Sequence, residues 1–327
     1  MPNSLEQSIF NTVRYFALFD MPVTAVQIWR ALVLDRDPPA GGDSRLRWQG
    51  QHLPKLSEVR RLLGTSAWLQ QRLGTAWGYF FLRGKEESVR RRLNRHVIAQ
   101  HKWRLTRKLA KYLALVPCVR MIAGSGSLAL SNTRPSSDLD MFVIVRGGRI
   151  WTTRLLLLLV AQLLGRRRKY WDRQAPDRLC FNHFITDTEL TMPAAVRNLY
   201  TAVAYSHLVP LFGVRMWSRF EAANGAWIRN FLMYPDTPPL LPKQGVALPF
   251  WVRELKNFFE EMLLEPLGEF LERSAEKRQR RAIREHTQPG RSGRVAISPT
   301  ELAFHPDSRV PDILSQFAQD AGQKTLL

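Results

Sequence analysis

Two aspartates at the head of an apolar run are the side chains in this sequence best placed to do chemistry. Asp138 and Asp140 flank one leucine and open the segment DLDMFVIV. If this segment is a β-strand, its side chains alternate, so both carboxylates face one side of the sheet. Two carboxylates so placed can share a divalent cation, because such cations prefer oxygen ligands. The spacing therefore predicts a metal site at Asp138 and Asp140.

A glycine and a serine precede this pair at the end of another apolar run, VRMIAGSG. Ten residues separate Ser127 from Asp138. Gly126 lets a phosphate approach the backbone with no side chain in the way, and Ser127 offers a hydroxyl and an amide. A phosphate cradle beside a metal is what phosphoryl transfer requires, since the cation neutralises the triphosphate and holds the leaving group. A lone Asp-x-Asp would be a weak signal, and a capped turn with two exposed aspartates is the alternative.

This order of strand, Gly-Ser, gap and Asp-x-Asp strand resembles the DNA polymerase β-like nucleotidyltransferase superfamily over about residues 105 to 190. The resemblance implies a mixed sheet with flanking helices. It implies Mg²⁺ or Mn²⁺ bound by Asp138 and Asp140, and a nucleoside triphosphate whose phosphates meet Gly126 and Ser127. The implied reaction moves a nucleoside monophosphate to the hydroxyl of an unidentified acceptor.

The third carboxylate that active members of this superfamily carry on a later strand has no clear counterpart here. The matching segment is LCFNHFI, in which Asn182 occupies the expected place and brings an amide oxygen without charge. Asp177 or Asp187 could supply the acid in another register, and His183 is either a base or a packed strand residue. The domain is then a slow enzyme, an enzyme with a displaced acid, or a nucleotide binder without turnover.

Several basic residues after the second strand could meet the triphosphate or a nucleic-acid acceptor. Arg154 is the candidate that we assign to the cofactor, together with Arg149 and the cluster at 166–169. Arg120 and Arg134 are weaker candidates. Each of them alone also fits an ordinary solvated surface charge.

The elements that position these residues follow from hydrophobic periodicity. We expect strands from Val119, at 139–145 and at 179–185, and an apolar helix at 150–164. A long basic helix at 85–116 should lead into them. In that helix we expect Val97 and Tyr112 among the core residues, and Arg95 and Lys102 among those facing solvent.

The first 84 residues predict a winged-helix-like domain. Two helices within the first 33 residues, a helix after Ser57, and a hairpin of strands at 68–73 and 77–82 give the helix, helix, helix, hairpin order. Residues 34–54 predict an irregular connection. Such a module either contacts DNA or only packs against its neighbour.

The remaining chain divides into a nucleotidyltransferase domain at 85–192, a helical region at 193–286 interrupted near Pro266, and a basic linker and tail at 287–327. The tail holds a possible strand and turn, VAISPTELAFHPDSR, and a short helix. Its FHPDSR element and the chain order resemble uncharacterised bacterial proteins in which a winged-helix segment precedes such a domain. The predicted fold class is α+β.

The composition indicates phosphate-bearing partners. The 327 residues carry a net charge of +20, which attracts nucleotide or nucleic acid, although an arginine-rich proteome would give the same excess. A rival reading is therefore a nucleotide-sensing or nucleic-acid-binding regulator that uses the winged helix. The start lacks a secretory signal, and the apolar run at 155–164 is too short to span a bilayer, so we expect a cytoplasmic protein. Cys118 and Cys180 lack zinc or disulfide spacing, and we expect both to be small buried hydrophobes.

Overall fold

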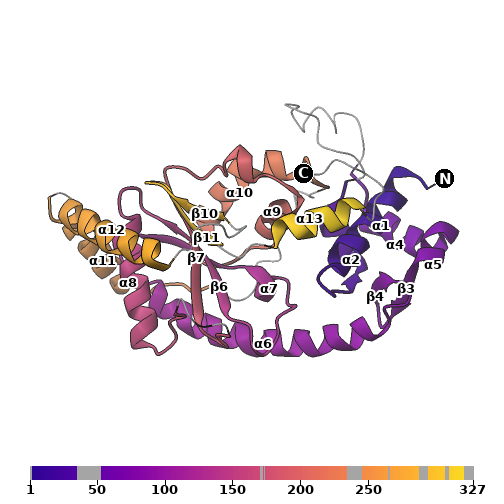
Figure 1. The fold of residues 1–327 in the computed structure, drawn as a ribbon, viewed down its shortest axis with the longest axis horizontal. Coiled ribbons are helices and arrows are strands. Elements are labelled where there is room, and N and C mark those ends of the chain that lie inside the picture. The colour runs from indigo at the N-terminus through magenta and orange to yellow at the C-terminus, as the bar shows by residue number, and fades with distance from the viewer. Residues whose placement is uncertain are drawn as a thin grey trace.

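A computed structural model describes residues 2–34, 53–169, 172, 174–233, 245–263, 266–286, 294–305 and 309–319. The described residues combine helices with one six-stranded sheet and two smaller sheets (Figure 1), so the α+β class is confirmed. Most of the 34–54 connection, the linker at 287–293 and Asp307 of the FHPDSR element lie outside the described residues. Among the described helices, none has both the length and the hydrophobicity that crossing a bilayer requires.

The central sheet has six strands in the order β10-β11-β7-β6-β5-β8. The predicted strands are present as β5 (Val119–Gly124), β6 (Leu139–Val145) and β7 (Leu179–Thr186). Strands β6 and β7 pair in parallel, and the other neighbours pair antiparallel. This mixed sheet places the end of β5 and the start of β7 on either side of the start of β6, where the two aspartates lie.

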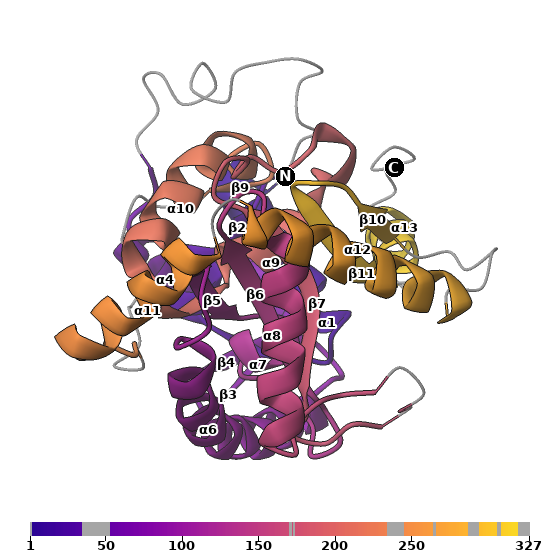
Figure 2. The ribbon, with the colours of Figure 1, turned by 90° about the vertical axis from the view of Figure 1, so that its left-hand side faces the viewer.

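Helices cover both faces of this sheet, as Figures 1 and 2 show. One face packs on α6 (Glu87–Leu113) and α8 (Ile150–Leu163), and the other on α9 (Leu199–Ser206) and α10 (Val214–Ile228). Alternate strand residues divide between two cores, so Val143 belongs to the α6 and α8 side while Phe142 belongs to the α9 and α10 side. This division arises because successive side chains of a strand point to opposite faces of the sheet.

The long basic helix α6 follows a different burial pattern from the one expected. Val97 and Tyr112 are each 52% exposed, whereas Arg95 and Lys102 are buried. The prediction for these four side chains was wrong because a buried loop on the inner side of α6 needs hydrogen-bond donors. Long cationic side chains supply those donors, and the aliphatic residues at 97 and 112 turn outward.

The N-terminal module contains the expected helices, with one correction in its hairpin. Its elements are α1 (Ser4–Ala17), β1 (Val23–Thr24), α2 (Ala25–Arg30), α4 (Leu56–Thr65), α5 (Ala67–Arg72), β3 (Leu73–Ala76) and β4 (Tyr79–Leu82). The first predicted strand is mostly the helix α5, because the Ser66 hydroxyl caps it by accepting from the Leu69 amide at 3.3 Å. The hairpin is shorter, and Trp77 and Gly78 form its turn with positive φ angles.

The predicted helical region also contributes a strand. Within it, β8 (Val209–Phe212) separates α9 from α10 and pairs with β5 at the sheet edge. The reading of continuous helix there was wrong, since pairing with an open sheet edge outweighs local helical propensity. The short β9 (Leu232–Met233) pairs with β2 (Leu32–Val33) and so ties this region to the N-terminal module.

The C-terminal third returns to the sheet. The helix expected to break near Pro266 is α11 (Phe250–Met262) followed by α12 (Leu267–His286). The possible strand and turn of the tail is a hairpin of β10 (Arg294–Ile297) and β11 (Glu301–His305), and β11 pairs with β7. The last helix, α13 (Val310–Gln319), packs near α1, where the Arg14 guanidinium lies 4.3 Å from the centre of the Phe317 ring.

Candidate metal and phosphate site

The two aspartates lie side by side at the start of β6. One potential ligand atom from each of Asp138, Asp140 and Cys180 lies within 4.8 Å of the others. All three residues are half-buried. Both carboxylates are therefore on one face of the sheet, as the alternation predicted. The two acids and the thiol form the group with metal-ligand spacing in the described part of the chain.

The glycine of the Gly-Ser pair packs directly against one of these acids. Gly126 has a φ of +61°, and a Cβ added to it would lie 2.5 Å from Oδ2 of Asp140. The amide before it, from Ser125, donates to the Asp140 carbonyl at 3.0 Å. Gly126 and Ser127 then open the one-turn helix α7 (Gly126–Ala129). The bend and the acid pair are thus neighbours, and only glycine fits at position 126.

Asn182 reaches the same acid from the neighbouring strand. Its Nδ2 donates to Oδ1 of Asp140 at 2.9 Å. The β6 and β7 register shifts here, because Met141 pairs with Phe181 while Phe142 pairs with His183. Asn182 is the extra residue of this bulge, and bulges are common where a side chain must be aimed at a site.

Cys180 is a site residue that the sequence analysis missed. The expectation of a buried hydrophobe was wrong for it, since its Sγ belongs to the acid group and accepts from the Arg168 guanidinium at 3.4 Å. Burial, and next the charges of Asp140 and Asp138, raise the pKa of this thiol. The signal was available, because Cys180 lies two residues before Asn182 on one strand.

Negative charge is in excess at this position. Burial, and then the neighbouring Asp138, raise the pKa of Asp140 to about 7, while Arg168, Cys180 and Asn182 oppose that rise. Arg168 also forms an ion pair with Asp138. Tyr200, from α9, has its pKa raised by burial and then by Asp140. Two carboxylates share one guanidinium, which is the arrangement that a bound cation would stabilise.

The alternative acids are engaged elsewhere. Asp177 accepts from Lys102 at 2.6 Å. Asp187, at the opposite end of β7, accepts from the Gly147 amide at 2.9 Å. His183 is buried, with Nε2 3.0 Å from Glu301, and burial lowers its pKa. Within the described residues the third potential ligand is therefore a thiol and not a carboxylate.

The basic candidates also separate by position. Arg154 bonds Gln279 and lies with its guanidinium 4.7 Å from the centre of the Phe304 ring. Burial lowers the pKa of Arg154 to about 10. Arg149 donates to the Leu263 carbonyl at 2.6 Å. Arg154 therefore points toward α12, and Arg149 points toward the end of α11, just before α12. Arg168, from the 166–169 cluster, is the arginine that contacts the acid pair.

Buried cations of α6 hold the loop between the Gly-Ser bend and the acids. Arg92 donates to the carbonyls of Leu130 and Ser131 at 3.1 and 2.6 Å. Nearly three helical turns further along α6, Lys102 donates to the Ser137 carbonyl at 2.8 Å, directly before Asp138. Carbonyls buried in an irregular loop need donors, and here they receive charged ones. The loop that spaces the two motifs is therefore fixed to the helix.

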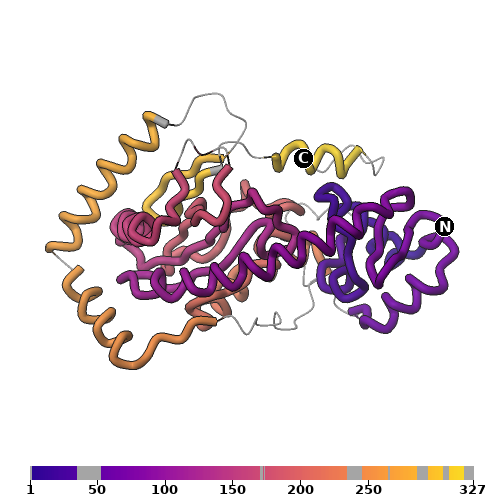
Figure 3. Tube along the Cα trace, turned by 90° about the horizontal axis from the view of Figure 1, so that it is seen from below, coloured from indigo at the N-terminus to yellow at the C-terminus, as the bar shows by residue number. Residues whose placement is uncertain are grey.

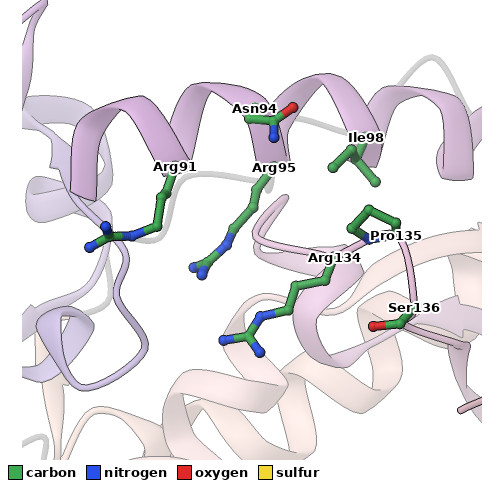
Figure 4. A pocket seen from close by; sticks show the side chains of 7 residues that line it. All are labelled: Arg91, Asn94, Arg95, Ile98, Arg134, Pro135 and Ser136. Atoms are coloured by element: carbon green, nitrogen blue, oxygen red, sulfur yellow. The ribbon is translucent and has the colours of Figure 1, made fainter. Parts of the chain in front are cut away.

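A basic pocket of about 390 Å³ lies between α6 and this loop (Figure 4). Arg91 and Arg95 on the helix and Arg134 on the loop contribute its charge. Asp20 offsets part of that charge by pairing with Arg91 at 2.9 Å and with Arg95 at 3.0 Å. The pocket is lined by Arg91, Asn94, Arg95, Ile98, Arg134, Pro135 and Ser136. It contains more cationic groups than Asp20 neutralises.

Comparison of the chain with protein-family models, with curated proteins and with solved structures found no match.

Proposed function

We propose that this protein is a metal-dependent nucleotidyltransferase of the DNA polymerase β-like type. The observation that carries the proposal is the acid pair, Asp138 and Asp140, lying against the glycine of a Gly-Ser bend. A Cβ added to Gly126 would lie 2.5 Å from Oδ2 of Asp140, so the bend that would bind phosphate is in contact with an acid that would bind the cation. The proposed reaction transfers a nucleoside monophosphate from a triphosphate to an acceptor hydroxyl.

The donor set fits a divalent cation. Asp138 and Asp140 would hold Mg²⁺ or Mn²⁺, which would neutralise the triphosphate and assist its leaving group. The pKa of Asp140, raised first by burial and then by the charge of Asp138, supports this assignment. Cys180 adds a soft ligand, and soft ligands favour transition metals over magnesium. Manganese is therefore expected to support binding at least as well as magnesium.

Among the described residues no third carboxylate lies near the pair, which should slow or prevent turnover. Asn182 offers an amide whose nitrogen is assigned toward Asp140. An amide cannot accept a proton from an acceptor hydroxyl, so this position contributes orientation and no base catalysis. Asp177 and Asp187 are held by other partners, which disfavours a displaced acid. A slow enzyme and a nucleotide binder without turnover remain the two forms of the proposal.

Arg168 is proposed to contact the triphosphate. In the structure its guanidinium joins Asp138 and Cys180, and 37% of the side chain is exposed. A cation on the acid pair would compete with the guanidinium for the same oxygens. The released arginine would then lie beside the phosphates, with the planar donors that suit them.

The test of the site is calorimetric binding of a non-hydrolysable nucleoside triphosphate with Mg²⁺ or Mn²⁺. Asp138→Ala with Asp140→Ala should weaken metal-dependent binding at least about a hundredfold, or about 2.7 kcal/mol. The matched control, Glu285→Ala with Asp312→Ala, removes two exposed carboxylates elsewhere and should bind as wild type. Equal binding by both double variants would reject the site.

A second candidate function is nucleic-acid binding, favoured by the basic pocket and by the element order of the N-terminal module. We interpret α1, β1, α2, α4 and the β3–β4 hairpin as a winged helix that would present the pocket to a phosphate backbone. Arg134→Gln should weaken duplex binding and lower its salt slope by about one. Arg215→Gln, which changes an exposed arginine on α10 outside the N-terminal module and the pocket, is the comparison variant and should bind duplex as wild type. Failure to bind duplex even at low salt would remove this candidate and leave the first untouched.

A further inference from the structure

Helix α11 is docked on the body by charged side chains. Lys256, 7% exposed, donates to the carbonyls of Ala114 and Val119 at 3.1 and 2.8 Å. Glu260, 5% exposed, accepts from the Cys118 amide at 2.8 Å and pairs with Arg120. These hydrogen bonds pair backbone groups just before and at the start of β5. The face of α11 that packs on the protein is therefore its charged face.

The apolar face of the same helix is consequently exposed. Large side chains that ordinarily enter a core are between 49% and 69% exposed along α11 and the start of α12. We define the α11–α12 apolar surface as Phe250, Trp251, Leu255, Phe258, Met262 and Phe270. The five members on α11 fall within about half of the helix circumference, beside the docked face. Glu254 and Glu261 fall within the same half of the circumference, so the exposed stripe carries two acids among its apolar members.

The extent of this surface is at the upper end for an apolar patch on a monomer and approaches one side of a protein interface. With about 200 Å² per aromatic side chain, its four aromatic members at their exposed fractions leave on the order of 500 Å² accessible. Leu255 and Met262 extend it further. The largest apolar patch of a typical monomer is about 300–600 Å², and a stable interface buries about 800 Å² on each partner.

The charges around the surface distinguish between possible occupants. On α11 the exposed charges are Arg253, Glu254 and Glu261, with acids in the majority, whereas the outer side of α12 continues as a basic stretch that includes Arg273 and Lys277. Two copies related by a twofold axis can place α11 of each beside α12 of the other, which brings acids to bases. An anionic bilayer would instead meet the two glutamates.

We propose that the α11–α12 apolar surface is the interface of a symmetric dimer of this chain. The surface lies at the end of the molecule remote from the N-terminal module (Figure 3). It is also remote from the acid pair, because α11 docks at the start of β5 while Gly126 follows its end. Dimerisation through this surface leaves the candidate site open, and the proposal is independent of the function assigned to that site.

Sedimentation equilibrium of the full chain tests the proposal. As its concentration is raised to about 100 µM, the wild-type protein should reach twice the 37.8 kDa mass of the single chain. Trp251→Ser with Phe258→Ser should raise the dimer Kd at least about a hundredfold, since central aromatic anchors dominate interface energetics. Both residues are more than half exposed, so the melting temperature of the monomer should be maintained.

The control variant is Trp77→Asn, which removes an 82% exposed tryptophan from the hairpin tip in the N-terminal module. Its positive φ suits asparagine, and this variant should dimerise as wild type. A monomeric wild type throughout the concentration range would overturn the proposal. So would a wild-type monomer that co-sediments with phosphatidylglycerol vesicles while the double variant does not, because the surface would then bind a bilayer.

Discussion

Two regions of the molecule place charge inside the protein but differ in how that charge is balanced. One is the loop clamp, which we define as Lys102 of α6 with its acceptors on the loop and on Asp177, and the other is the acid pair at the head of β6. In the clamp, Lys102 meets two carbonyls and Asp177, so its charge is matched by acceptors. In the acid pair, two carboxylates share Arg168, and the pKa of Asp140 rises to about 7. Removing one partner from matched buried charges is strongly destabilising, whereas unmatched buried charge marks a place that a ligand can complete.

The largest effect is expected from breaking the clamp. Lys102→Met leaves Asp177 and two loop carbonyls without their donor, and should lower the free energy of unfolding by about 3 kcal/mol. Urea denaturation measures this change. Lys108→Met, which removes an exposed lysine from the same helix, should change stability by less than about 0.5 kcal/mol. Equal effects of the two substitutions would show that the clamp carries no special energy.

A substitution in the acid pair should raise the free energy of unfolding, whereas breaking the clamp lowers it. Asp140→Asn removes a destabilising charge and should raise the free energy of unfolding at pH 8 by about 2 kcal/mol, while abolishing metal-dependent triphosphate binding.

The pH dependence gives the same contrast. The pKa of Asp140 is raised from 3.8 to about 7 in the folded protein, so the unfolded chain releases this proton first as pH rises. The contribution of this group to stability is therefore fully present below about pH 4 and is lost by about pH 7. Asp140→Asn should lack this loss in parallel melts from pH 4 to 8. A variant that follows the wild-type curve across that window would contradict the charge imbalance.

A third carboxylate beside the acid pair should increase its excess negative charge and produce a smaller effect. Asn182→Asp places a third carboxylate at the position that lies 2.9 Å from Asp140. Magnesium affinity should rise about tenfold, or about 1.4 kcal/mol, and stability without metal should fall. Calorimetry with Mg²⁺ measures the gain. Asn257→Asp adds the same charge to an exposed position of α11, and a gain of similar size there would argue against a specific ligand.

Local pattern was enough for the elements that carry the motifs. Strands at 119–124, 139–145 and 179–186 and the helix at 150–163 lie where periodicity placed them, because each buries an apolar run of the right length. Local pattern failed at 67–72 and 209–212. A serine cap decides the first segment and pairing with a distant strand decides the second.

The positions of individual side chains were harder to predict from the sequence. The facing of Asp138 and Asp140 follows from a period of two, which is a property of a single strand. The burial of Lys102 depends on contacts with residues 33 or more positions away in the chain, and the acids that Cys180 meets lie 40 or more positions away. No local pattern records which loop carbonyl lacks a donor, or which arginine will reach the acids.

The amino-acid order alone thus determined the α+β class, the strands that bear the motifs and the common facing of the two acids, since these are effects of short-range periodicity. Only the tertiary structure decided that Cys180 and Arg168 join the acids, that the cations of α6 are buried, and that α11 turns its aromatic face outward. These features depend on burial and on charge matching between distant segments, which exist only once the chain has folded.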